Sequence, residues 1–208
     1  MRTLSLIFGL FFASSTPGVE VERVLALVNG VPVLSSDVEL AEIANLLPRV
    51  EGEGERDYHN AVLEALIALE LRYQDLKAAH LDQQLVEDWE AAWDKVLQQV
   101  GGEVELSRRL AAAGLHRESL MHLVRRAALV EAYVAQRFAS SLRVTQEEIQ
   151  KTYEAAFPPS PEGSGKRPLL ADVRPQLERL IRERKLAEAV SRWTQELAQR
   201  GEVLRYRR

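Results

Sequence analysis

The 208-residue sequence contains no cysteine. This absence excludes disulfides, thiolate zinc sites, iron–sulfur clusters, a cysteine nucleophile and a lipidated N-terminal cysteine. Histidine is scarce as well, and the four that occur, His59, His80, His116 and His122, never show the H-x-x-x-H spacing of a helical metal site. We therefore predict a protein that needs neither a metal nor another cofactor.

Catalytic motifs are also missing. The sequence has no G-x-S-x-G, S-x-x-K, H-E-x-x-H or Walker A pattern. Adjacent carboxylates such as Glu147 and Glu148 are typical of a solvated helix surface, because an acid–base pair needs a pocket that separates the two pKa values. These absences predict a protein that is not an enzyme.

Glycines number only 11 and aromatic residues make up 6% of the chain, whereas apolar residues make up 46% and charged residues 28%. This balance argues against whole-chain disorder and against a polytopic membrane protein. Residues 20–105 carry 6 basic and 19 acidic side chains, and residues 166–208 carry 12 basic and 6 acidic ones. We expect these two regions to attract each other within one molecule, which argues against a nucleic-acid partner.

The one long apolar run lies at the start of the chain. Met1 and Arg2 precede an uncharged segment, Leu4–Ala13, and small residues follow it. This layout is typical of a secretory signal peptide, and ten apolar residues are too few to cross a bilayer, which takes about 20. We predict a signal peptide over residues 1–18, cleaved after Ser15 or Gly18, and a periplasmic mature chain without stable membrane insertion. A buried helix and an uncleaved anchor are the alternatives.

A small sheet is predicted from the two ends of the mature chain. Residues 23–28 and 31–34 have strand character and flank Asn29-Gly30, the favoured dipeptide of a type I′ hairpin. Pro32 cannot donate to a ladder, so the second strand should lie at an edge. Residues 203–206 also have strand character and can pair with the hairpin, which alone would be marginal in water.

The rest of the chain predicts helices. Ser36 and Glu39 form a capping box that opens a helix to about residue 48. Further helices are predicted from apolar spacing over about residues 57–79, 82–100, 106–113, 117–138, 145–153 and 172–200. Residues 157–168 are rich in proline and glycine and predict a linker. The fold class is therefore mainly α, with a helical domain over 19–156, the linker, and a long returning helix and strand over 169–208 that pack on the same domain as one compact unit.

Candidate binding residues are large apolar side chains on the predicted helices. Trp89 and Trp93 lie one turn apart on a stripe that also holds Val86, Val96 and Leu97. We take eight residues as candidates for an apolar groove that binds peptides: Trp89, Trp93, Leu120, Met121, Val124, Tyr133, Phe138 and Tyr153. Packing in a hydrophobic core is the alternative interpretation of each of them.

Four segments, in order along the chain, resemble the periplasmic chaperone SurA and its relatives, among them the PrsA foldases and PpiD-like isomerases. Val28–Val38 is similar to the opening of that family, and Gly114–Leu120 to the loop before its long helix. Val144–Glu154 is similar to the segment that leads into its isomerase domain, and Arg174–Tyr206 to its returning helix and final strand.

The sequence departs from the family at one place. In these relatives a parvulin domain of about a hundred residues, an ordinary small-domain size, would follow Tyr153, where only the linker stands here. No catalytic residue of a parvulin has a counterpart. The resemblance thus implies an ATP-independent chaperone module without the isomerase, whose partners are unfolded exported polypeptides, outer-membrane proteins in particular. A homodimer or a module for one fixed extracytoplasmic partner, and a degenerate prolyl isomerase, are the alternatives.

Overall fold

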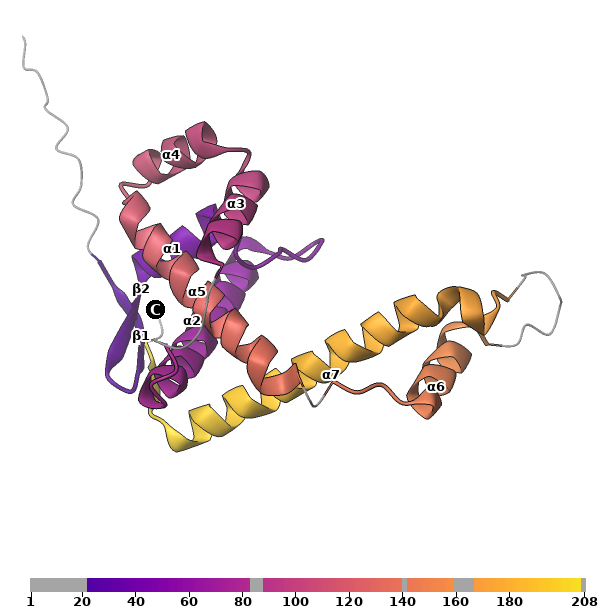
Figure 1. The fold of residues 1–208 in the computed structure, drawn as a ribbon. Helices are drawn as coiled ribbons and strands as arrows, with labels where there is room; N and C mark the ends of the chain where they lie inside the picture. The colour runs from indigo at the N-terminus through magenta and orange to yellow at the C-terminus, as the bar shows by residue number, and fades with distance from the viewer. Residues whose placement is uncertain (1–21, 83–87, 140–141, 159–166, 207–208) are drawn as a thin grey trace, which may run out of the picture.

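The computed structural model describes residues 22–82, 88–139, 142–158 and 167–206 (Figure 1). The predicted signal peptide, Val86 and most of the predicted linker lie outside these ranges. The described residues form seven helices and one three-stranded sheet, which confirms the mainly helical fold with an N-terminal hairpin and a long C-terminal helix. None of the described helices combines the length and the apolar character that a membrane crossing requires.

The sheet joins the two ends of the chain. Its strands are β1 (Val24–Val28), β2 (Val31–Leu34) and β3 (Val203–Arg205), in the antiparallel order β2-β1-β3. The hairpin turn has positive φ at both of its central residues, Asn29 and Gly30, as a type I′ turn requires. The predictions of the hairpin, of Pro32 at an edge and of a third strand from the C-terminus are thus confirmed.

Asn29 fastens the end of the chain to the hairpin. Its side chain accepts a hydrogen bond from the Glu202 backbone N–H (2.7 Å) and donates one to Gln74 (2.7 Å), while its own N–H donates to the Glu202 carbonyl (2.8 Å). Gly201 passes so close that a Cβ there would lie 2.7 Å from the Asn29 Oδ1. The absence of a side chain at Gly201 therefore lets β3 reach β1.

The helices follow the predicted order. Their bounds are α1 (Ser35–Ile43), α2 (Glu55–Ala78), α3 (Trp89–Val100), α4 (Glu103–Ala112), α5 (Arg117–Phe138), α6 (Gln146–Ala156) and α7 (Leu170–Arg200). The capping box at the start of α6 is confirmed, since the Thr145 hydroxyl accepts the Glu148 N–H and the Glu148 carboxylate accepts the Thr145 N–H.

The predicted start and end of α1 are wrong. The capping residue is Leu34 rather than Ser36, and the Asp37 carboxylate accepts the Leu34 backbone N–H at 2.9 Å. At the other end, Asn45 has a φ of 52°, and this left-handed residue stops the helix well before Pro48. Burial of its carboxylate at the start of α1 raises the pKa of Asp37.

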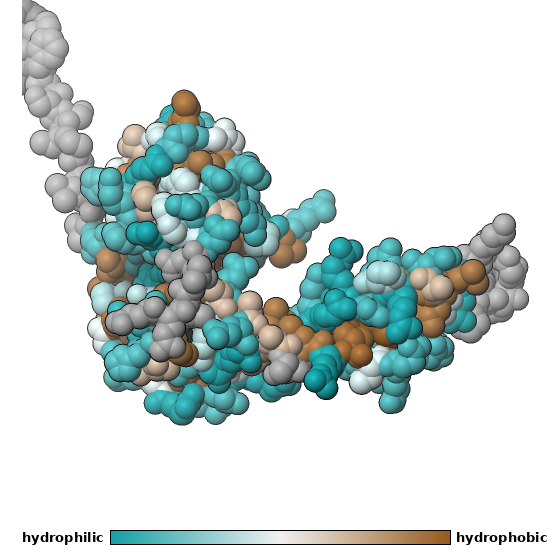
Figure 2. All heavy atoms as spheres, viewed as in Figure 1, coloured by the Kyte–Doolittle hydropathy of each residue, from teal (hydrophilic) through white to brown (hydrophobic). Residues whose placement is uncertain are grey.

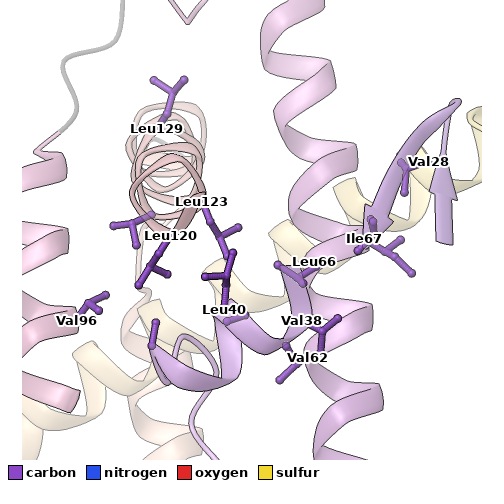
Figure 3. Close-up of a cluster of buried hydrophobic side chains, with 14 of the residues drawn as sticks. Val28, Val38, Leu40, Val62, Leu66, Ile67, Val96, Leu120, Leu123 and Leu129 are labelled. Carbon is purple, nitrogen blue, oxygen red and sulfur yellow. The ribbon is translucent and has the colours of Figure 1, made fainter. Parts of the chain in front are cut away.

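Most of the buried side chains form one core, in the part of the molecule that we call the body. The body contains the sheet, α1 to α5 and the C-terminal half of α7. Figure 3 shows Leu40 of α1 and Leu123 of α5 pointing toward one another, with Val96 of α3 beside Leu120. Helices from the middle of the chain thus pack against the hairpin and α1, which the sequence places at its start.

A second, smaller core lies in what we call the arm, formed by α6 and the N-terminal half of α7. Ile149 and Tyr153 of α6 are buried there against Leu177 and Ile181 of α7. The arm extends away from the body (Figure 1). The structure therefore differs from the expected single compact unit, because α6 packs on α7 instead of on the helices that precede it.

Helix α7 belongs to both cores because its apolar face changes side. Each residue turns an α-helix by about 100°, so Trp193 lies about 160° around the axis from Leu177, and Leu197 about 160° from Ile181. Leu177 and Ile181 are buried in the arm, and Trp193 and Leu197 are buried in the body. One continuous helix thereby connects two cores that cover opposite sides of it.

An ion pair between α7 and α6, as well as apolar packing, holds the two helices of the arm together. Lys185 of α7 donates to the Glu148 carboxylate (2.8 Å) and to the Arg143 carbonyl (2.6 Å). The hydrogen bond from Lys185, with the backbone bond from Thr145, lowers the pKa of Glu148 to about 2. An unfolded glutamate has a pKa of about 4.3.

We expect the contact between α6 and α7 to weaken as the pH falls from about 4.5 to about 2. In this window the unfolded arm binds a proton at Glu148 that the folded arm does not, so the stability present above pH 4.5 is lost as Glu148 is protonated. Amide NMR shifts of Thr145 and Glu148 against pH measure this change. The Glu148→Gln variant should lack it, and an equal transition in that variant would assign the change to other carboxylates.

Candidate polypeptide-binding surface

The tryptophans of α3 are covered by arginine side chains. Trp93 is buried in the body, and the Arg117 guanidinium lies 4.9 Å from the centre of its ring. Trp89 is half-buried, and the Arg125 guanidinium lies 4.5 Å from its ring centre. Cation–π contacts of this kind stabilise the indole where it lies. Both rings therefore lie against arginine side chains at the body, and Trp89 stays partly exposed.

The candidates on the first half of α5 are mostly core residues. Leu120 and Val124 are fully buried between α5 and its neighbours, whereas Met121 is half-buried and packs against the same core. A side chain that is already surrounded by protein cannot contact a polypeptide unless the fold opens. The structure thus places Leu120 and Val124 as packing residues and leaves part of Met121 at the surface.

The second half of α5 carries an aromatic cluster that holds α7. Trp193 is 3% exposed, and its ring packs edge-on against Tyr133 (5.5 Å between centroids) and Phe138 (6.0 Å). Its indole N–H donates to the Asp75 carboxylate at 3.2 Å, and Arg137 lies 4.9 Å from the ring centre. Tyr133 is buried by these contacts and Phe138 only partly.

Tyr153 lies apart from the other candidates, in the arm. Its ring is buried beside Phe157, 5.4 Å between centroids, and Arg167 lies 4.3 Å from the ring centre. Its hydroxyl donates to the Pro168 carbonyl at 2.5 Å. Tyr153 therefore joins the two sides of the predicted linker, and the eight candidates do not form one continuous groove.

A further apolar surface lies on α7, the helix that connects body and arm. Leu180, Ala187 and Val190 follow one another at spacings of seven and three residues, which places them on one flank of the helix. Leu180 is 53% exposed, Ala187 is exposed and Val190 is half-buried. We call these three residues the α7 strip. Figure 2 shows hydrophobic atoms along the middle of α7, where the surface is hollowed between the two parts.

The α7 strip was not predicted as a site, although the helix that carries it was predicted from its apolar spacing. The signal in the sequence that could have indicated it is the apolar face of α7, which moves from one side of the helix to the other between Ile181 and Trp193. A helix whose apolar positions move from one side to the other must expose some of them at the crossover, because no single neighbour can cover both sides. Phe138, at the end of α5, is the one predicted candidate in contact with Trp193 that also stays partly exposed.

A cleft of about 970 Å³ opens on another side of the body, and we call it the β3 cleft. It lies between α2 and the end of the sheet, with Leu25, Leu63 and Tyr206 among the apolar side chains of its wall. Arg205 of β3 forms two hydrogen bonds with the Glu64 carboxylate, at 2.7 and 2.8 Å, which lower the pKa of Glu64. This pair is one contact between the acidic region, residues 20–105, and the basic region, residues 166–208.

Many charged groups of the described residues meet groups of opposite charge, in pairs or in sets of three. Glu105, for example, accepts hydrogen bonds from Arg108 and Arg109, and these lower its pKa to about 2. In the described ranges, no three histidine, aspartate or glutamate side chains converge as metal ligands would. The features of the described surface that could receive a partner are therefore the α7 strip and the β3 cleft.

Comparison with models of protein families gives no match, and comparison with curated proteins gives none either. The resemblance to SurA thus stays a prediction from the sequence.

Proposed function

We propose that this protein is an ATP-independent chaperone that holds unfolded polypeptides exported across the inner membrane, with outer-membrane proteins in transit as its clients. The observation that supports it is the α7 strip, a partly exposed apolar surface on the helix that connects body and arm. An unfolded client exposes apolar side chains, and burying them against Leu180, Ala187 and Val190 removes both surfaces from water. The export part of the proposal rests on residues 1–18.

The surroundings of the α7 strip suit a weak and tolerant contact. Leu180 and Val190 are aliphatic side chains without a fixed polar partner, and they lie among charged neighbours such as Arg179 and Glu183. An aliphatic surface selects by hydrophobicity more than by sequence, and a small one releases its ligand readily. We propose that holding requires no cofactor and no catalytic step.

We expect the double variant Leu180→Asp, Val190→Asp to lose most of its ability to suppress aggregation. The two carboxylates would put charge where a client buries apolar side chains, and both positions are far enough from full burial for the fold to tolerate them. Light scattering of several unrelated unfolded clients, at equal chaperone concentration, measures the effect.

A matched control is available on α4. Val104 is 85% exposed and lies in the body, so Val104→Asp adds a charge at an apolar surface residue away from the α7 strip. This variant should suppress aggregation as well as the wild type does. Equal losses in both variants, or full activity in the double variant, would contradict the proposed site.

A further inference from the structure

The outer edge of β3 is open. The β1–β3 register pairs Leu27 with Leu204, and backbone hydrogen bonds join Asn29 to Glu202 and Tyr206 to Leu25. In an antiparallel pair, alternate residues direct their N–H and C=O toward the neighbouring strand, and the residues between them direct theirs outward. The backbone groups of Val203 and Arg205 therefore point away from β1, and none of the described residues forms a hydrogen bond with them.

The two edges of the sheet differ. The β2 edge contains Pro32, which has no N–H to offer and so discourages another strand from pairing there. The β3 edge contains no proline between Glu202 and Tyr206. Its backbone N–H groups are therefore all present, which leaves a place where a further strand can pair.

The β3 cleft lies where the side chains of such a strand would go. Its wall contains Arg205 of β3 and Tyr206, the residue after it, together with α2 residues, and it contains no residue of β2. Successive side chains of a strand point to opposite faces, so a strand placed alongside β3 would direct every second side chain over this cleft. The apolar residues Leu25 and Leu63 can receive them, while Arg56 and Glu55 lie at the same cleft and accommodate polar neighbours.

We propose that β3 binds an extended segment of an unfolded polypeptide as a fourth strand. Backbone hydrogen bonds to Val203 and Arg205 supply the contact that every sequence can make, and the β3 cleft favours segments with alternating apolar side chains. A second copy of this chain is a poorer occupant. Two three-residue strands paired with each other fall well short of the roughly 1,200 Å² that a stable interface buries. This site is distinct from the α7 strip, and its choice of occupant rests on the proposed function.

The sharpest test uses N-methylated peptides. A seven-residue peptide that alternates valine and threonine is prepared unmodified, methylated on the valine nitrogens, and methylated on the threonine nitrogens. Because the apolar side chains fix which face points to the cleft, only one set of N–H groups can reach β3 for a given strand direction. Binding is followed by NMR shifts of the Val203 and Arg205 amides. We expect one methylated peptide to bind roughly tenfold more weakly and the other to stay within about threefold of the unmodified peptide.

A protein variant gives the complementary test. Val203→Pro removes an outward N–H and leaves the β1 ladder at Glu202, Leu204 and Tyr206, whereas Val203→Ala keeps the N–H. We expect Val203→Pro to bind the unmodified peptide roughly tenfold more weakly and Val203→Ala to bind within about threefold. Equal binding of both methylated peptides would overturn the proposal, and so would a wild-type dimer that Val203→Pro dissolves while no peptide binds.

Discussion

Replacing Trp193 with alanine should lower the free energy of unfolding by about 3–5 kcal/mol, the usual cost of truncating a buried tryptophan. Trp193 is 3% exposed and joins three parts of the body, since it contacts Tyr133 and Phe138 of α5 and donates to Asp75 of α2. Its loss would therefore also loosen the attachment of α7. Urea unfolding measures the stability, and small-angle X-ray scattering measures whether the arm keeps its position relative to the body.

Trp89 is the matched control for this prediction. It is also a tryptophan beside an arginine, but it is half-buried at the surface of the body. We expect Trp89→Ala to cost clearly less than Trp193→Ala and to leave the scattering profile unchanged. A loss below about 1 kcal/mol for Trp193→Ala, far under the expected range, would show that other contacts hold α7.

Replacing Arg126 with methionine should cost about 2–3 kcal/mol. Glu70 is 5% exposed, and its carboxylate accepts hydrogen bonds from Arg126 (2.7 Å) and Gln74 (2.8 Å). Breaking a buried ion pair costs about 3–5 kcal/mol because one charge stays buried without its partner. Arg126 is partly open to water, which places the expected cost at or below the low end of that range. Urea unfolding of the variant gives the value.

The double variant Glu70→Met, Arg126→Met tests the reason for this cost. With both charges replaced by apolar side chains of similar length, no uncompensated charge remains, and stability should return to within about 1 kcal/mol of the wild type. Should the double variant be as unstable as the single one, the cost would come from lost packing around Tyr73 and Gln74 and not from the buried carboxylate.

Local signals account for the parts of the fold that the sequence predicted well. Asn29-Gly30 specifies a turn because both residues adopt positive φ angles. Helix α5 was predicted well because its apolar residues recur along one face from Leu120 to Tyr133. The start of α1 was predicted wrongly because two capping patterns overlap there. Asp37 reaches back to Leu34, and this competes with the box that Ser36 and Glu39 would form.

The candidate site was harder to predict, because burial depends on partners that are distant in the sequence. Tyr133 and Phe138 looked suited to a groove, but Trp193 covers Tyr133 and part of Phe138. Trp89 and Trp93 looked suited to one as well, and their covering groups, Arg125 and Arg117, come from another helix. Spacing shows which face a residue lies on and cannot show what packs against that face. Whether any of the eight candidates contacts a client stays a prediction.

The most direct measurement of the central claim is photo-crosslinking from the α7 strip. Ala187 is exposed in the middle of the strip, and Ala111 is an exposed alanine on α4 in the body. A photoreactive residue is placed at each position in turn, and an unfolded outer-membrane protein is added. The account predicts client crosslinks from position 187 and few from position 111. Crosslinks of equal yield at both positions, or none at 187 while aggregation is still suppressed, would contradict it.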